Sequence, residues 1–220
     1  TIFSICSISK LFTSIGVMQQ RDAGRLRLDD PVREHLPWFR IQEAHADFGP
    51  ATIEGILTHS AGLPRESDHP YWSAPDFEFP TREQILDRVS RQTTLYPTFT
   101  YSQYSNLGLT LAGEIVAATS GIPYHRYVRE HILEPLGMSR TSPEIPAGLW
   151  GSEMAVGYSA ITREGARVPM PIFQARGIAP AAGFASTVED LARFASWQFR
   201  LLAGHGSEIL DSNTLREMHR

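Results

Sequence analysis

Residues 3–20 join a short apolar run to a helical pattern, and a serine and a lysine lie where the two meet. The run from Phe3 to Ile5 is typical of a strand. Ser7 and Lys10 follow, three positions apart, so both side chains lie on one side of the first helical turn. This junction requires a strand that leads directly into a helix. The spacing of apolar residues predicts one buried helix face, formed by Ile8, Leu11, Phe12, Ile15 and Met18.

A serine at a helix N-terminus is well placed to act as a nucleophile. The helix dipole and the unpaired backbone N–H groups there stabilise an alkoxide and then an oxyanion. Lys10, one turn later, adds a cation, or acts as a base if burial disfavours its charge. The same pair also fits a polar helix start with a solvated lysine, so other residues must distinguish the two interpretations.

Composition excludes several classes of protein. The 220 residues are 42% hydrophobic, which is enough for one domain with its own core, and the net charge of -4 is spread along the chain. We therefore expect no nucleic-acid partner. The single cysteine, Cys6, excludes an intrachain disulfide, and no apolar run is long enough to span a membrane. His125 and His131 lie on opposite faces of a predicted helix, and no nucleotide-binding fingerprint is present, so we expect no metal and no cofactor.

A second polar group lies on the turn before another amphipathic helix. Tyr104, Ser105 and Asn106 precede a helical pattern that ends near Gly121, so their side chains can point into a cleft. The same residues also suit a simple helix cap with a packed aromatic. His59, after a short helix capped by Thr52, is either a catalytic base or, as we favour, a buried and hydrogen-bonded histidine.

Local patterns predict several further elements. Capping boxes at residues 81–84 and 186–189 predict helix starts, residues 123–134 predict a helix, residues 180–184 a turn, and residues 150–170 short strands. Residues 64–80 are an irregular loop that either walls a pocket for an apolar substrate group or packs on the surface. Its aromatic residues are Tyr71, Trp72, Phe77 and Phe79.

Taken together, these segments resemble the serine β-lactamase and penicillin-binding protein superfamily, in particular its class C-related branch with the family VIII esterases. The tetrad Ser7-Ile8-Ser9-Lys10 matches the first motif of that superfamily, and Tyr104-Ser105-Asn106, 97 positions after Ser7, matches the second. Blocks 26–32, 57–63, 135–138 and 182–192 follow in the order of the superfamily. The resemblance covers the chain from about residue 3 to its end.

The resemblance implies a role for each matching residue. Ser7 would attack a carbonyl and form an acyl-enzyme, and its backbone N–H would be half of the oxyanion hole. Tyr104 would transfer protons as general base and acid, with Lys10 favouring its ionised form. Asn106 would bind the amide or carbonyl of the substrate and orient Lys10. The implied partner is a small-molecule ester, D-amino-acid peptide or β-lactam.

The third motif of the superfamily, a Lys/His-x-Gly strand, is not found, and the segment at His205 is a poor candidate for it. The sequence therefore predicts an α+β, β-lactamase/transpeptidase-like fold in which helices pack on an antiparallel sheet and terminal strands are missing. We expect one incomplete domain over residues 1–220, with about 25–146 mainly helical. Alone, this piece should be poorly soluble and inactive, and restoring the termini should give activity.

Three interpretations of function remain to be compared. The first is a serine hydrolase, with a preference for carboxylesterase or peptidase activity because the aromatic loop could hold an apolar group. The second is a non-catalytic binding or scaffold relative of the same fold. The third, a cysteine hydrolase using Cys6, His59 and Asn106, lacks the local cysteine signature of such enzymes. The sequence does not set a compartment, and the resemblance is compatible with a periplasmic or secreted protein.

Overall fold

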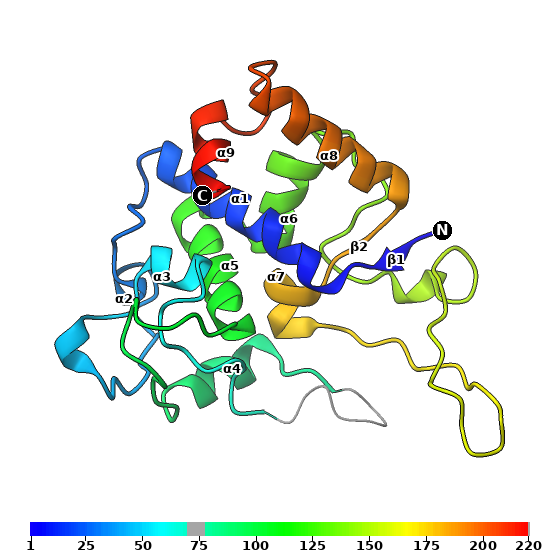
Figure 1. The fold of residues 1–220 in the computed structure, drawn as a ribbon, viewed down its shortest axis with the longest axis horizontal. Coiled ribbons are helices and arrows are strands. Elements are labelled where there is room, and N and C mark those ends of the chain that lie inside the picture. Colours follow the sequence, from blue (N-terminus) through cyan, green and yellow to red (C-terminus); the bar gives the residue numbers. More distant parts are fainter. Residues whose placement is uncertain (70–77, 220) are drawn as a thin grey trace.

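The computed structural model describes residues 1–69 and 78–219, and helices make up most of that part (Figure 1). The three longest helices of the described part are α1 (Ser9–Asp22), α5 (Asn106–Ser120) and α8 (Val188–Leu202). The shorter helices are α2 (Val32–His35), α3 (Ile53–Leu57), α4 (Arg82–Val89), α6 (Tyr124–Val128), α7 (Ala179–Ala182) and α9 (Ser212–Met218). A π-helical turn, Arg129–Leu133, continues α6, so a helical segment over about 123–134 is confirmed.

Two short strands pair beside the start of α1. β1 (Phe3–Ser4) and β2 (Ala185–Ser186) are antiparallel, with Phe3 opposite Ser186. β1 enters α1 through a 3-10 turn, Cys6–Ile8, and β2 leads into α8. The predicted strand-to-helix junction is therefore confirmed, and helices pack on a small antiparallel sheet as the α+β prediction requires.

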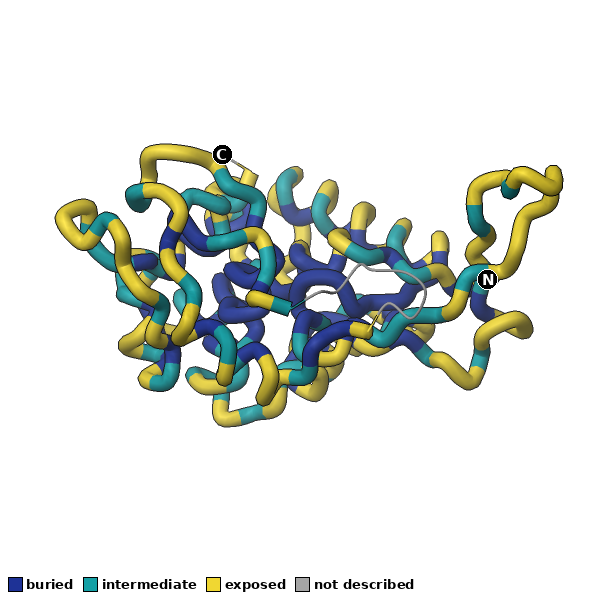
Figure 2. The backbone as a smooth tube through the Cα atoms, turned by 90° about the horizontal axis from the view of Figure 1, so that it is seen from below, coloured by how far each residue is buried: buried dark blue, intermediate teal, exposed yellow. Residues whose placement is uncertain are grey.

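Helix α1 runs between two apolar clusters and is covered on both sides. Val17 packs in a cluster with residues of α2 to α5 and α7, whereas Phe12 packs in a second cluster with residues of α6, α8 and α9. The ring of Phe12 stacks on Phe184 with 5.1 Å between centroids. Figure 2 shows the resulting buried centre with an exposed periphery. Packing from two sides fixes the axis of α1 and, with it, the direction of its side chains.

The predicted apolar face of α1 is correct over its centre and wrong at its start. Phe12, Ile15 and Met18 are buried, but Ile8 and Leu11 are exposed. The helices that bury this face pack along the later turns of α1, and within residues 1–69 and 78–219 no element buries Ile8 and Leu11, whereas Ser9 and Lys10 of the same first turn are buried.

Most helix starts lie where the cap residues predict them. Thr52 accepts a hydrogen bond from the backbone of Gly55, and Thr81 forms a complete capping box with Gln84. The prediction for residues 186–189 was wrong by one position, because Thr187 caps α8 and accepts from the N–H of Asp190. Ser186 cannot cap the helix, since it is part of β2.

Two loop predictions also differ from the structure. Residues 180–184 were predicted as a turn, but residues 179–182 form α7, which Pro180 starts as a favourable first-turn residue. Residues 150–170 form isolated bridges, such as Tyr158 with Pro169, and no strand within the described chain. Gly and Pro breaks in this segment interrupt the backbone ladder that longer strands need.

Candidate active site

Ser7 lies in the 3-10 turn that connects β1 to α1. Its side chain is exposed, and the preceding residue, Cys6, has a φ of 43°, in the left-handed region that non-glycine residues seldom adopt. Ser9 stabilises this turn, because its hydroxyl donates to the carbonyl of Cys6 and accepts from the N–H of Phe184 at 3.0 Å. As the second residue of the turn, Ser7 has a backbone N–H without an intrahelical partner.

Lys10 has three hydrogen-bond partners, the full donor capacity of an ammonium group. Its Nζ donates to Asn106 Oδ1 at 2.8 Å, to the carbonyl of Ala181 at 2.8 Å and to Ser7 Oγ at 3.2 Å. The side chain is only 8% exposed. Asn106 and the carbonyl of Ala181 thus bind two of the three N–H groups and direct the third toward Ser7.

Tyr104 and Asn106 flank the N-cap of α5. Ser105 caps the helix by accepting from the N–H of Gly108 at 2.9 Å, and it donates to the carbonyl of Pro64 at 2.7 Å. The cap fixes its neighbours on both sides. Tyr104 Oη lies 2.7 Å from Ser7 Oγ, and Asn106 Oδ1 accepts from Lys10. The four residues that the sequence singles out therefore lie in one hydrogen-bonded group, although 96 positions separate Lys10 from Asn106.

Two neighbouring charges were missed at the level of sequence. Glu66 Oε1 accepts from Asn106 Nδ2 at 2.6 Å, which orients the amide so that its oxygen faces Lys10. The guanidinium of Arg65 lies 5.0 Å from the ring centroid of Tyr104, and Lys10 Nζ lies 4.7 Å from it. The signal that could have found Arg65 and Glu66 is their position two and three residues after block 57–63, which the resemblance had already marked.

His59 occupies the turn after α3 and contacts Tyr104 and Ser105 of the second motif. It has a φ of 60°, and its Nδ1 accepts from the N–H of Ser105 at 3.2 Å. Its ring centroid is 4.6 Å from that of Tyr104. Burial and, second, the charge of Lys10 lower the pKa of His59 below its ordinary value, which favours the neutral imidazole that this acceptor role needs. The preferred prediction, a buried and hydrogen-bonded histidine, is confirmed for the hydrogen bond and the helix end, but His59 is only partly buried.

The contacts of Cys6 do not match those of a thiol nucleophile. Cys6 is half-buried and packs against the larger apolar cluster, and the Nδ1 of His59 is engaged by a backbone N–H. Asn106 bonds Lys10 and Glu66. The three residues of the cysteine-hydrolase alternative therefore have separate partners.

Other candidates contribute less to the site. Tyr71, Trp72 and Phe77 of the aromatic loop lie outside the described residues, while Phe79 is buried and packs on Phe173. His205 lies in an exposed loop after α8. Over residues 1–69 and 78–219, no group of three or more His, Cys, Asp or Glu side chains could hold a metal, and no helix is long and apolar enough to cross a membrane.

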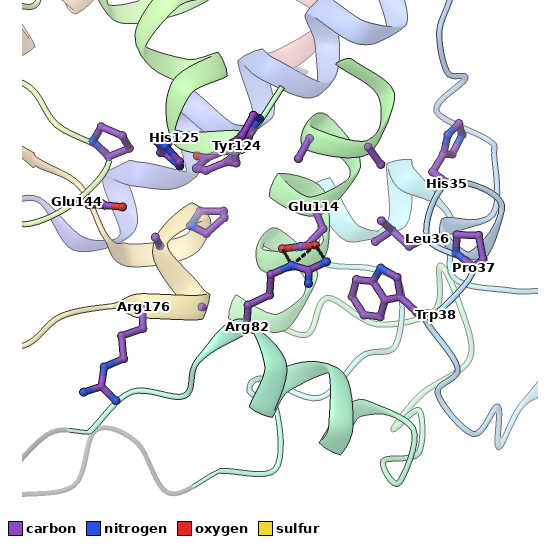
Figure 3. Close-up of a pocket in the computed structure, with 17 residues that line it drawn as sticks. His35, Leu36, Pro37, Trp38, Arg82, Glu114, Tyr124, His125, Glu144 and Arg176 are labelled. Atoms are coloured by element: carbon purple, nitrogen blue, oxygen red, sulfur yellow. Dashed lines mark hydrogen bonds and ion pairs between the residues drawn. The ribbon is translucent and has the colours of Figure 1, made fainter. Parts of the chain in front are cut away.

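A separate cavity of about 610 Å³ lies against α5 and α7 (Figure 3). Arg82 and Glu114 form an ion pair in it, with 2.7 Å between Nη2 and Oε2. None of the four candidate residues lines this cavity. Its wall includes Tyr124 and Pro180, and both residues are hydrogen-bonded to Thr13.

Comparison with known proteins identifies the family of the chain. Residues 1–220 match the Beta-lactamase family. The chain is 30% identical over 218 residues to Beta-lactamase-like protein 2 of Dictyostelium discoideum, covering 97% of this chain and 38% of that protein. It is 32% identical over 143 residues to the D-alanyl-D-alanine-carboxypeptidase/endopeptidase AmpH of Escherichia coli, covering 64% of this chain and 37% of that protein.

Among solved structures, the octameric penicillin-binding protein homologue from Pyrococcus abyssi superposes with a TM-score of 0.82 and 28% identity, over 100% of this chain and 49% of that one. The chain thus spans about two fifths of the length of those two curated relatives and about half of this solved structure. The fold is that of the β-lactamase/transpeptidase-like class. The chain belongs to the Beta-lactamase family.

Proposed function

We propose that this chain carries the acylation site of a serine hydrolase, with Ser7 as the nucleophile. The observation that supports this most directly is the position of Ser7 Oγ, 2.7 Å from Tyr104 Oη and 3.2 Å from Lys10 Nζ. A serine needs a base within hydrogen-bond reach to become nucleophilic, and both neighbours are within or close to that reach.

The proposed reaction uses each residue in turn. Tyr104, as phenolate, takes the proton of Ser7 as Oγ bonds to the carbonyl carbon, and the oxyanion forms at the backbone N–H of Ser7. The tetrahedral intermediate collapses, the bond to the leaving group breaks, and Tyr104 returns the proton to that group. Water then attacks the acyl-enzyme by the reverse sequence. Asn106 binds the carbonyl or amide of the substrate and also holds Lys10. Lys10 keeps positive charge beside the oxygens of Ser7 and Tyr104.

The substrate class is a carboxylic ester or a D-amino-acid peptide, with a β-lactam as the competing carbonyl. Peptide hydrolysis is supported by the similarity to the relative from Escherichia coli, a D-alanyl-D-alanine-carboxypeptidase/endopeptidase. These substrates share the acylation step and differ in the shape of the pocket and in how the acyl group leaves.

Intact mass spectrometry of the full-length protein tests the proposal. After exposure to a fluorophosphonate or a labelled penicillin, we expect one adduct, on Ser7, which disappears in Ser7→Ala and forms about 10²- to 10⁴-fold more slowly in Tyr104→Phe. Ser14→Ala, on the same helix, and Tyr101→Phe, an exposed tyrosine near the second motif, are matched controls that should react normally.

The choice of probe then separates the substrates. Reaction with the penicillin, or turnover of a p-nitrophenyl ester or a D-alanyl-D-alanine peptide, assigns the class. A folded protein that forms no adduct with any probe would instead favour a non-catalytic binding or scaffold relative.

A further inference from the structure

The short helix α7 supplies the carbonyl that holds Lys10. Ala181 is in the last turn of α7, where carbonyl groups lack an intrahelical N–H donor, and Lys10 Nζ donates to it at 2.8 Å. The position of α7 therefore sets where the ammonium of Lys10 lies, and with it the 3.2 Å distance from Nζ to Ser7 Oγ.

Thr13 holds the preceding carbonyl of the same helix. It lies three positions after Lys10 on α1 and is completely buried, and its Oγ1 is 2.6 Å from the carbonyl oxygen of Pro180. The same Oγ1 is 2.6 Å from Tyr124 Oη. A carbonyl only accepts, so Thr13 must donate to Pro180 and the phenol of Tyr124 must donate to Thr13. Two successive carbonyls of α7 are thus bound by two side chains from one face of α1.

Tyr124 can only act as a donor in this arrangement. Tyr124 lines the cavity of Figure 3, and its hydroxyl is bonded to Thr13. Burial raises the pKa of Tyr124 well above its ordinary value, so the phenol keeps its proton throughout the working pH range.

Gly113 of α5 allows α7 to approach. A Cβ at this position would lie 2.3 Å from Pro180 Cγ and 3.4 Å from Tyr124 Cδ2, so a side chain would displace one or both rings. Pro180 of α7 thus lies close to the backbone of α5 at Gly113 and is bonded by the hydroxyl of Thr13, which Tyr124 bonds in turn.

We propose that Thr13 and Tyr124 are positioning residues for acyl transfer at Ser7, because together they fix α7 so that the carbonyl of Ala181 directs Lys10 toward Ser7. This inference rests on the proposed function. Neither residue touches Ser7 in the structure, so each acts through α7 and Lys10.

Matched variants of the full-length protein test the inference. Thr13→Val and Tyr124→Phe keep side-chain volume and remove the hydroxyls, and Thr13→Ser restores one of them. Tyr127→Phe is the control, because Tyr127 is a buried tyrosine of the same helix whose hydroxyl bonds Gln19 and Gln20 of α1 and no residue of α7. At a temperature where all variants are folded, the first two should lower the maximal acylation rate by the fluorophosphonate about 10- to 100-fold, with little change in its half-saturating concentration.

Thr13→Ser and Tyr127→Phe should acylate near the wild-type rate, although Tyr127→Phe also loses buried hydrogen bonds. Wild-type rates in folded Thr13→Val and Tyr124→Phe would overturn the inference, as would an equal loss in Tyr127→Phe. Amide hydrogen exchange at residues 179–183 gives a second measure, independent of activity, and should rise in Thr13→Val and Tyr124→Phe alone. Unchanged exchange would also overturn the inference, whereas a wild-type protein that forms no adduct but shows the exchange difference would count against the proposed function instead.

Discussion

The site region and the connecting segment of this molecule are held by different means. In the site region, α1, α5 and α7 are linked by hydrogen bonds between buried groups far apart in sequence, such as Lys10 to Asn106 and Thr13 to Pro180. The connecting segment, residues 143–178, extends outward beside α7 (Figure 1) and consists of 3-10 turns and isolated bridges in the described chain. The comparison predicts that the geometry of the candidate site depends on helix packing. Exposed parts of the connecting segment should tolerate change, whereas its buried residues, such as Ile145 and Ile178, should not.

Truncation of a core ring should give the largest difference between the two regions. Phe12→Ala removes a fully buried ring that contacts Phe184 and Phe194, and we expect a loss of about 3–5 kcal/mol in the free energy of unfolding. Ile161→Ala, at a connecting-segment residue that is 65% exposed, should cost less than about 0.5 kcal/mol. Urea unfolding measures both, and equal losses would refute the comparison.

The junction of the two regions can be examined at Asp190. This buried carboxylate of α8 accepts from the N–H of Arg140 at 2.8 Å and the hydroxyl of Thr141 at 2.9 Å, just before the connecting segment begins. Asp190→Ala removes the acceptor of the Arg140 N–H and one partner each of Thr141 and Arg193, and we expect a cost of about 2–3 kcal/mol. Glu189→Ala, its exposed neighbour, should change stability by less than about 0.5 kcal/mol. If denaturant midpoints show no difference between the two variants, the junction is not held at Asp190.

A pair of glycine substitutions compares the space available in each region. Gly113→Ala forces a methyl group to within 2.3 Å of Pro180, and we expect a net loss of about 1–3 kcal/mol despite the better helix propensity of alanine. Gly148→Ala, in the connecting segment, meets no atom within 4 Å and should be neutral or stabilise by up to about 1 kcal/mol. We expect the midpoint of thermal unfolding to fall in Gly113→Ala and to stay unchanged or rise in Gly148→Ala. Stabilisation by Gly113→Ala would show that α7 is free to move.

The smallest effect is a pH dependence confined to the site region. The pKa of His59 is lower in the folded than in the unfolded chain, so as the pH falls the unfolded chain takes up the proton first. The contribution of His59 to the free energy of unfolding is therefore complete above about pH 6.5 and is lost as the pH falls below that value. His59→Asn removes the titrating group and keeps a residue that tolerates the positive φ. The stability advantage of wild type over the variant should shrink between about pH 7.5 and 5.5. A constant difference in unfolding free energy across that range would contradict this.

The sequence predicted the placement of the motif residues but not how they are held. Ser7 and Tyr104 were expected at helix starts because cap residues and apolar spacing are local signals, and the resemblance supplied the expectation that they meet. The carbonyl of Ala181 could not be predicted, since every residue carries one and only the tertiary fold selects it. The link from Thr13 to Tyr124 joins residues 111 positions apart, and neither belongs to a pattern that indicates the other.

Errors in the predicted fold have a similar origin. Leu11 was assigned to a buried face by periodicity, which gives the direction of a side chain but not whether another element covers it. Ser186 was assigned to a helix cap by composition, and pairing with β1 took precedence. Local rules thus succeed where the chain itself decides and fail where a distant segment does.

The anchoring of Lys10 on a peptide carbonyl affects how such a site can change over generations. A single codon change can delete Asn106 or Glu66 and with them one support of the lysine. No codon change deletes the carbonyl of Ala181, because whatever amino acid is encoded there brings the same oxygen. This support depends on the position of the backbone and not on the side chain at residue 181. It is lost only when substitutions at neighbours such as Gly113 or Thr13 move the peptide.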